Sequence, residues 1–279
     1  MKECYLRTEE GNIFYWISSP YDNTKKTLFF LHGVTGDHTL FQEQIGYFED
    51  KYNILLWDAP AHGKSRPYQL FTYEKASMAI KDIFNENHIS RAIFIGHSMG
   101  GFVTQAVIKR FPEIVEKFIA VDSTPYGKEY YSKSDVFWLK QVEWMGHLLP
   151  MKSLKKAMAK QVAETEKAYN NMLDMLSIYD KKELCHLMGI GYAGFLNDNC
   201  DLEIKCPVLL ILGDKDKAGK VKKYNMKWTE KTGYRLVVVE NAGHNSVMDN
   251  PDVINATIID FIENERIKKK REGNKHEKD

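Results

Sequence analysis

The 279-residue sequence contains few cysteines, and their spacing argues against both a disulfide framework and a structural zinc site. There are four, with no C-x-x-C pair and no histidine at the intervals typical of a zinc site. A disulfide framework and a structural zinc centre are therefore not expected. We predict free thiols in a reducing compartment for all four, Cys4, Cys185, Cys200 and Cys206.

A long apolar run and an excess of charge of one sign are also missing. No stretch approaches the roughly 20 apolar residues that a membrane span needs, and residues 1–7 lack the apolar core of a signal peptide. Lys and Arg number 39 against 38 Asp and Glu, so no nucleic-acid partner is indicated. We expect a cytoplasmic protein without stable membrane insertion.

Glycine-rich loops of the kind that bind nucleotide phosphates are absent as well. No G-x-G-x-x-G pattern follows the first strand-like run with an acidic residue downstream, and no Walker-type loop is found. Neither a dinucleotide cofactor nor a metal ion is predicted.

Short apolar runs alternate with helical patterns along most of the chain. Unbroken apolar runs fit strands buried on both faces of a parallel sheet, and their alternation with helices implies βα units. The sequence thus predicts an α/β protein with a mostly parallel central sheet and helices on both faces. The predicted strands are 1–7, 12–18, 28–31, 54–57, 92–95, 118–121, 208–212 and 236–239. The predicted helices are 40–48, 73–87, 102–111, 221–231 and 253–262.

The alternation breaks between residues 125 and 201, where no strand-like run of this type occurs and six of the eleven methionines gather. We interpret 125–201 as an inserted helical cap, or lid, on a core made of 1–124 and 202–265. Trp138 and Trp144 are candidates for the wall of a substrate pocket, although core packing explains such residues equally well. The charged end, 266–279, is expected to be a disordered tail.

One motif carries the strongest indication of chemistry. Residues 96–100 read Gly-His-Ser-Met-Gly, the pattern G-x-S-x-G, directly after an apolar strand and before a helical pattern. A serine in this setting sits on a sharp turn, a nucleophile elbow, that pushes its hydroxyl clear of the sheet. Ser98 is therefore the candidate nucleophile.

A serine hydroxyl needs a general base, and the base needs a carboxylate that orients it. His244 follows the last predicted strand and is the candidate base. Asp214 and Asp216 follow the strand at 208–212, and Asp122 ends the strand at 118–121, so all three are candidate acids. The carboxyl ends of parallel strands meet at one edge of the sheet, where open α/β folds place their sites.

Five motifs occur in the order found in α/β-hydrolases, and the chain resembles that family over roughly residues 10–265. They are His32-Gly33, Asp58-Ala59-Pro60-Ala61-His62-Gly63-Lys64-Ser65, Gly96-His97-Ser98-Met99-Gly100, Gly213-Asp214-Lys215-Asp216 and Gly243-His244.

The resemblance implies a role for each matching position. Ser98 would be the nucleophile and His244 the base, and the family pattern G-x-x-D favours Asp216 as the acid. Oxyanion donors are expected from the backbone N–H of Met99, at the elbow, and of Val34, in the loop after the strand at 28–31.

These features predict a serine hydrolase that cleaves a small or medium apolar acyl ester through an acyl-enzyme. Other reactions on the same triad stay open: C–C bond, thioester, lactone or amide hydrolysis, and cofactor-free perhydrolysis or haloperoxidation. A ligand receptor on the same fold is an alternative of another class. The predicted partner is a small acyl substrate, and a homodimer is compatible with the sequence.

Overall fold

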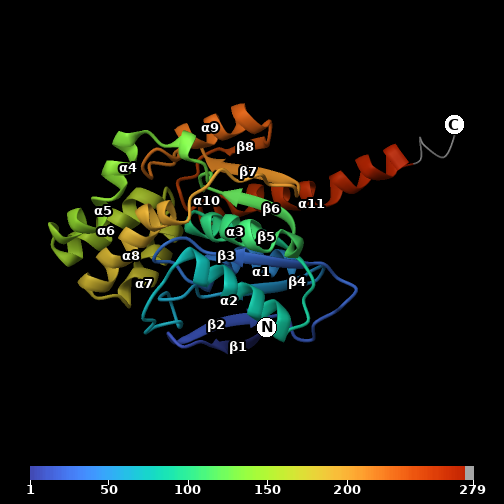
Figure 1. Ribbon diagram of the computed structural model, residues 1–279, viewed down its shortest axis with the longest axis horizontal. Coiled ribbons are helices and arrows are strands. Elements are labelled where there is room, and N and C mark those ends of the chain that lie inside the picture. Colours follow the sequence, from blue (N-terminus) through green and yellow to red (C-terminus); the bar gives the residue numbers. More distant parts are fainter. Residues whose placement is uncertain (274–279) are drawn as a thin grey trace.

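A computed structural model describes the backbone of residues 1–273 and the side chains of residues 1–264 (Figure 1). Its centre is an eight-stranded sheet in the order β1-β2-β4-β3-β5-β6-β7-β8. β2 pairs antiparallel with both β1 and β4, and the other neighbours are parallel. The strands are β1 Lys2–Arg7, β2 Asn12–Ile17, β3 Thr27–Leu31, β4 Asn53–Trp57, β5 Ala92–His97, β6 Val115–Val121, β7 Val208–Gly213 and β8 Arg235–Val239.

Helices cover both faces of the sheet, because its central strands are apolar on both sides. Every residue of β3, β4, β5 and β7 is buried. α2 packs with α3 on one face, and α1 packs with α11 on the other (Figure 1). The helices of the α/β core are η1 His38–Phe41, α1 Gln42–Phe48, α2 Tyr73–Glu86, α3 Met99–Arg110, η2 Pro112–Ile114, α9 Val221–Thr232, α10 Ser246–Asp249 and α11 Pro251–Gly273. This architecture confirms the predicted α/β class.

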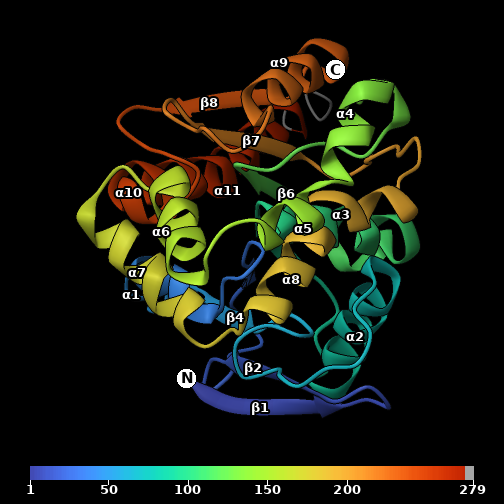
Figure 2. The same cartoon turned by 90° about the vertical axis from the view of Figure 1, so that its left-hand side faces the viewer.

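Only helices and irregular segments lie between β6 and β7 in the described chain; we call residues 125–201 the helical insertion. Figure 2 looks onto its helices, with the sheet behind them. Two of them begin with a reciprocal capping box, at Ser132 and at Asp180, which satisfies backbone donors at their first turns. The insertion comprises η3 Lys128–Tyr130, α4 Lys133–Leu139, α5 Val142–His147, α6 Met151–Val162, α7 Glu166–Ser177, α8 Lys181–Ala193 and η4 Gly194–Asn197.

Residues 266–273 of the predicted tail form the last part of α11, and 274–279 lie outside the described residues. None of the described helices combines the length and apolar character needed to cross a bilayer. The four cysteines are free thiols.

Candidate active site

Ser98 sits on a tight turn between β5 and α3. Its backbone adopts φ 49° and ψ −115°, a region that L-residues rarely occupy and that marks local strain. Neighbouring glycines make the turn feasible: a Cβ added at Gly96 would lie 2.6 Å from the Gly100 backbone, and one at Gly100 would lie 2.0 Å from the Leu31 carbonyl oxygen. The G-x-S-x-G pattern is therefore a steric requirement of this strand–turn–helix crossing.

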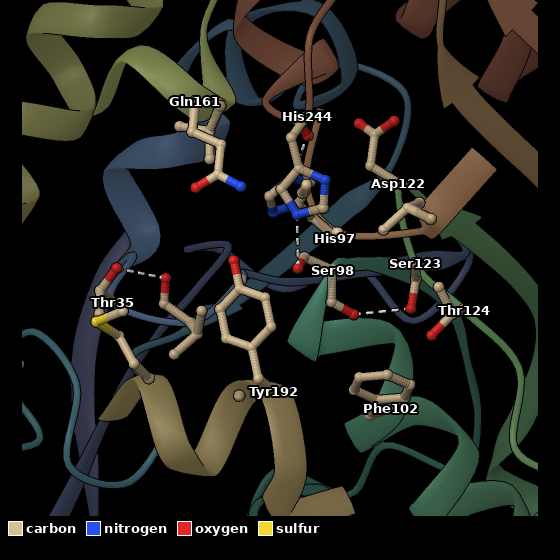
Figure 3. A pocket seen from close by; sticks show the side chains of 18 of the residues that line it. Thr35, His97, Ser98, Phe102, Asp122, Ser123, Thr124, Gln161, Tyr192 and His244 are labelled. Carbon is tan, nitrogen blue, oxygen red and sulfur yellow. Dashed lines mark hydrogen bonds between the residues drawn. The ribbon is translucent and has the colours of Figure 1, made fainter. Parts of the chain in front are cut away.

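The structure brings Ser98, His244 and Asp216 into one hydrogen-bonded chain (Figure 3 draws the Ser98–His244 bond). His244 Nε2 lies 2.8 Å from Ser98 Oγ, and His244 Nδ1 lies 2.9 Å from Asp216 Oδ2. These three residues follow β5, β8 and β7, three strands whose carboxyl ends meet at one edge of the sheet. The arrangement allows the imidazole to accept the serine proton while the carboxylate fixes its orientation.

Within the described part of the chain, Asp216 is the candidate acid whose carboxylate contacts His244. Its other oxygen accepts a hydrogen bond from the Ala218 N–H at 2.7 Å, which holds the carboxylate in place. Asp214 instead accepts from the Ala242 N–H at 3.1 Å. Asp122 accepts from the Gly213 N–H at 2.8 Å and from the Ser246 hydroxyl, so both rivals support the loops around the site.

Burial and charge oppose each other at His244. Burial alone disfavours the imidazolium, but the Asp216 charge and hydrogen bond outweigh it, so the pKa of His244 is raised above its ordinary value. Burial and then the neighbouring Asp216 charge raise the pKa of Asp122 to about 8. The contact with Asp216 thus favours the protonated form of His244.

His97 and His32 support the backbone around the triad. His97 Nε2 donates to the His244 carbonyl oxygen at 2.7 Å, and burial lowers the pKa of His97 to about 3, so the ring is neutral. His32 donates through Nδ1 to the Gly33 carbonyl oxygen and accepts from the Ala59 N–H through Nε2. A Cβ at Gly33 would lie 2.8 Å from His97 Nδ1, so a glycine is needed where this loop passes Ser98.

The two expected oxyanion donors, Val34 and Met99, belong to segments next to Ser98: Val34 follows Gly33, whose added Cβ would lie 3.1 Å from Ser98 Cβ, and Met99 follows Ser98 in the chain. Val34 follows β3 in the loop that lines the pocket, and Met99 is the first residue of α3. Among the described residues, neither backbone N–H donates a hydrogen bond in the turns, loops and helix caps. Both groups are placed in segments that border the nucleophile.

A pocket opens above Ser98 between the sheet edge and the helical insertion. Its cavity volume is about 120 Å³, whereas a cavity that holds a single water needs about 10–15 Å³. The space therefore suits an organic group of several non-hydrogen atoms. Most of its wall is apolar and comes from both the core and the insertion, including Val34, Phe102, Met158, Met172, Met188 and Phe195.

Trp138 and Trp144 do not belong to this pocket. Their side chains are 58% and 61% exposed and are absent from its wall. The adjacent Leu139 lines the pocket instead. The pocket wall therefore differs from the expected one at both positions. On α5 the residue that faces inward is Gly146, which packs against Cys185 of α8.

Two polar side chains of the insertion were not singled out from the sequence. Tyr192 projects from α8 toward Ser98, and Gln161 projects from α6 toward His244 (Figure 3). The Tyr192 hydroxyl has no hydrogen-bond partner among the described residues, and burial raises its pKa, so it stays protonated near neutral pH. Their sequence surroundings resemble any amphipathic helix, so only the packed structure identifies them.

One group of side chains has a composition that can bind a metal ion. Asp37, His38 and Asp58 bring three potential ligand atoms within 4.8 Å of one another. Their hydrogen bonds explain them structurally: Asp37 caps η1 through the Thr39 N–H, and Asp58 accepts from the His38 and Lys64 N–H groups. This cluster lies outside the pocket wall.

Comparison with known proteins agrees with the α/β fold. The model of the "Alpha/beta hydrolase family" matches residues 28–257. The chain is 24% identical to an uncharacterized hydrolase of Bacillus subtilis, over 90% of this chain and 94% of that protein. A shorter alignment, 33% identical, links it to a Haemophilus influenzae protein whose name places it among esterases or lipases; it covers 39% of this chain and 38% of that protein.

The fold likeness extends over nearly the whole chain. A thermophilic esterase from Thermogutta terrifontis superposes with a TM-score of 0.75 at 16% identity, covering 94% of this chain and 98% of that one. Since the family model spans most of the sequence, including all three residues of the hydrogen-bonded chain, this chain belongs to the alpha/beta hydrolase family.

Proposed function

We propose that this hydrolase is a serine hydrolase that cleaves small or medium apolar acyl esters. One observation carries the proposal: the unbroken chain from Asp216 through His244 to Ser98, at the floor of a largely apolar pocket. The carboxylate, the imidazole and the hydroxyl each occupy the position that acyl transfer requires.

The proposed reaction has two halves. Ser98 Oγ bonds to the ester carbonyl carbon while its proton passes to His244 Nε2; the C–O bond of the ester then breaks, and the alcohol leaves with that proton. Water next gives a proton to His244 and attacks the acyl-enzyme, and the proton returns to Ser98 as the carboxylic acid departs. Asp216 stays ionised and stabilises the imidazolium in both halves.

The negative oxygen formed in each half needs donors already in place. We assign this role to the backbone N–H groups of Met99 and Val34. Among the described residues, neither group donates a hydrogen bond in the turns, loops and helix caps, and Val34 lines the pocket together with Ser98. The adjacent Gly33 has no side chain to block the approach of the carbonyl.

We further propose that the helical insertion acts as a cap that holds the acyl group. Its α6, α7 and α8 supply Met158, Met172 and Met188 to the pocket wall. Methionine side chains are flexible, so this wall adapts to different apolar groups. Lactones and thioesters present the same carbonyl, and they are the first alternative substrates to compare.

The test is pre-steady-state hydrolysis of p-nitrophenyl acetate. We expect a burst of p-nitrophenol equal to the enzyme concentration, followed by slower turnover, because the alcohol leaves before the acyl-enzyme is hydrolysed. A ligand receptor on this fold would show neither burst nor turnover with esters, lactones or thioesters, and that result would reject the proposal.

The pH dependence of kcat/KM should report His244. The imidazole must be neutral to accept the serine proton, and its pKa is raised. We therefore expect kcat/KM to fall as pH drops, with a midpoint above the ordinary histidine value of about 6.5. A profile measured with a neutral ester, with a midpoint below that value, would contradict the electrostatic role given to Asp216.

Tyr192→Phe tests whether the free hydroxyl serves the reaction. A hydroxyl that donates to the developing negative charge is worth about 1.5–3 kcal/mol, so kcat/KM should fall about 10- to 100-fold. The control is Tyr169→Phe, another insertion tyrosine outside the pocket wall with no hydroxyl partner in the described contacts. Equal, small effects of the two substitutions would show that Tyr192 only fills space.

A further inference from the structure

The outer surface of the helical insertion exposes large apolar side chains. Six of the fifteen exposed large hydrophobic residues of the described chain come from the single stretch 137–149, with exposed fractions from 43% to 65%. The other nine are scattered along the sequence. We call these six the 137–149 surface: Phe137, Trp138, Trp144, Met145, Leu148 and Leu149.

The fold itself does not bury this surface. α5 uses its opposite side to pack on α8, where a Cβ at Gly146 would lie 2.9 Å from Cys185 Sγ. Trp144 and Leu148, four residues apart, therefore face outward together. A concentration of exposed aromatic and aliphatic side chains of this kind marks an interaction site.

The segment that contains the 137–149 surface and the helix that follows it is rich in positive charge. Residues 133–160 contain six lysines and two acidic residues, whereas the whole chain has a net charge of +1. Both acids are engaged: Asp135 is buried and bonded to Lys220, and Glu143 lies 3.3 Å from His186. Five lysines are exposed and have no ion-pair partner in the described structure: Lys133, Lys140, Lys152, Lys156 and Lys160.

The 137–149 surface also borders the pocket. Leu139 of α4, next to Trp138, lines the pocket wall, and so does Met188 of α8, which lies 3.4 Å from a Cβ placed on Gly146. An apolar molecule held at this surface would thus lie beside the pocket above Ser98.

We propose that the 137–149 surface docks this protein on an anionic lipid bilayer. Exposed tryptophan, phenylalanine and leucine side chains favour the boundary between headgroups and acyl chains, and surrounding lysines favour anionic headgroups. Pairing of two copies through the same surface is disfavoured, because a two-fold contact would bring both sets of lysines together. Docking goes beyond ester hydrolysis and does not depend on it.

The first test is flotation of the full chain with vesicles. We expect binding to equimolar phosphatidylcholine and phosphatidylglycerol, much weaker binding to phosphatidylcholine alone, and a loss at high salt through screening. Trp144→Ala/Leu148→Ala and Lys152→Glu/Lys156→Glu should each weaken binding to the mixed vesicles about tenfold or more. Ser98→Ala should float like the wild type, which separates docking from hydrolysis.

Matched controls remove the same chemistry from positions outside the helical insertion. Leu70→Ala/Met226→Ala deletes two side chains of similar exposure, and Lys205→Glu/Lys223→Glu makes the same charge change at lysines without ion pairs in the described structure. Both should bind vesicles like the wild type. Melting curves establish that every variant is folded.

Tryptophan fluorescence gives an independent measurement. The other three tryptophans, Trp16, Trp57 and Trp228, are buried. A blue shift on adding mixed vesicles should therefore come from Trp138 and Trp144 and be lost in Trp138→Phe/Trp144→Phe. The proposal is overturned if the wild type does not float, or if the surface variants float as well as their controls. It is also overturned if sedimentation shows a dimer that Trp144→Ala/Leu148→Ala dissociates, which would assign the surface to self-association.

Discussion

Replacing Ser98 with alanine is expected to lower kcat for ester hydrolysis by about 10⁴- to 10⁶-fold while the protein stays folded. The loss is large because Ser98 is the pocket nucleophile whose hydroxyl is hydrogen-bonded to His244 Nε2, and without it no acyl-enzyme can form there. Steady-state rates with p-nitrophenyl acetate measure the effect.

A matched serine controls for the substitution itself. Ser90 is exposed and precedes β5, whereas Ser98 follows that strand. Ser90→Ala should keep the wild-type kcat. Both variants should melt within about 4 °C of the wild type, because Ser90 is exposed and Ser98→Ala removes one side-chain hydrogen bond, the one to His244. Activity retained in Ser98→Ala would show that another residue is the nucleophile.

Asp216→Asn should give the second largest effect, a fall in kcat of about 10³- to 10⁴-fold. The amide can still touch His244 Nδ1, but it cannot stabilise the imidazolium, and it favours the wrong tautomer. Removing the charge that raises the pKa of His244 should also move the midpoint of the pH profile to lower pH.

Asp214→Asn is the control for this change. Asp214 lies two residues away and keeps its acceptor for the Ala242 N–H as an amide, so its rate and pH profile should stay close to the wild type. The assignment of the acid fails if Asp214→Asn is the slower variant, or if Asp216→Asn leaves the midpoint of the profile unchanged.

The centre of the sheet could be predicted because its strands are buried on both faces. Runs such as Leu28–Leu31 and Ile93–Ile95 are unbroken apolar stretches, and all their residues are buried in the structure. The hydrogen-bonded chain could be anticipated for a related reason: Ser98, Asp216 and His244 each follow a strand, and parallel strands end at the same edge.

The pocket wall could not be predicted in the same way. The insertion consists of short helices. Which side of each helix is buried depends on contacts between residues distant in sequence, such as Gly146 against Cys185. A tryptophan in such a helix can therefore face the pocket or the outside, and Trp138 and Trp144 face the outside. Tyr192 carries no sequence signal of its own, because its position depends on how α8 packs over Ser98.

Labelling with a fluorophosphonate, followed by mass spectrometry, tests the central claim most directly. The probe phosphonylates a serine only where a base activates its hydroxyl, so it reads the Ser98–His244–Asp216 chain without knowledge of the natural substrate. We predict a single adduct per chain, on the peptide that contains Ser98, absent in Ser98→Ala and formed much more slowly in Asp216→Asn. No adduct, or an adduct on another residue, would contradict the account.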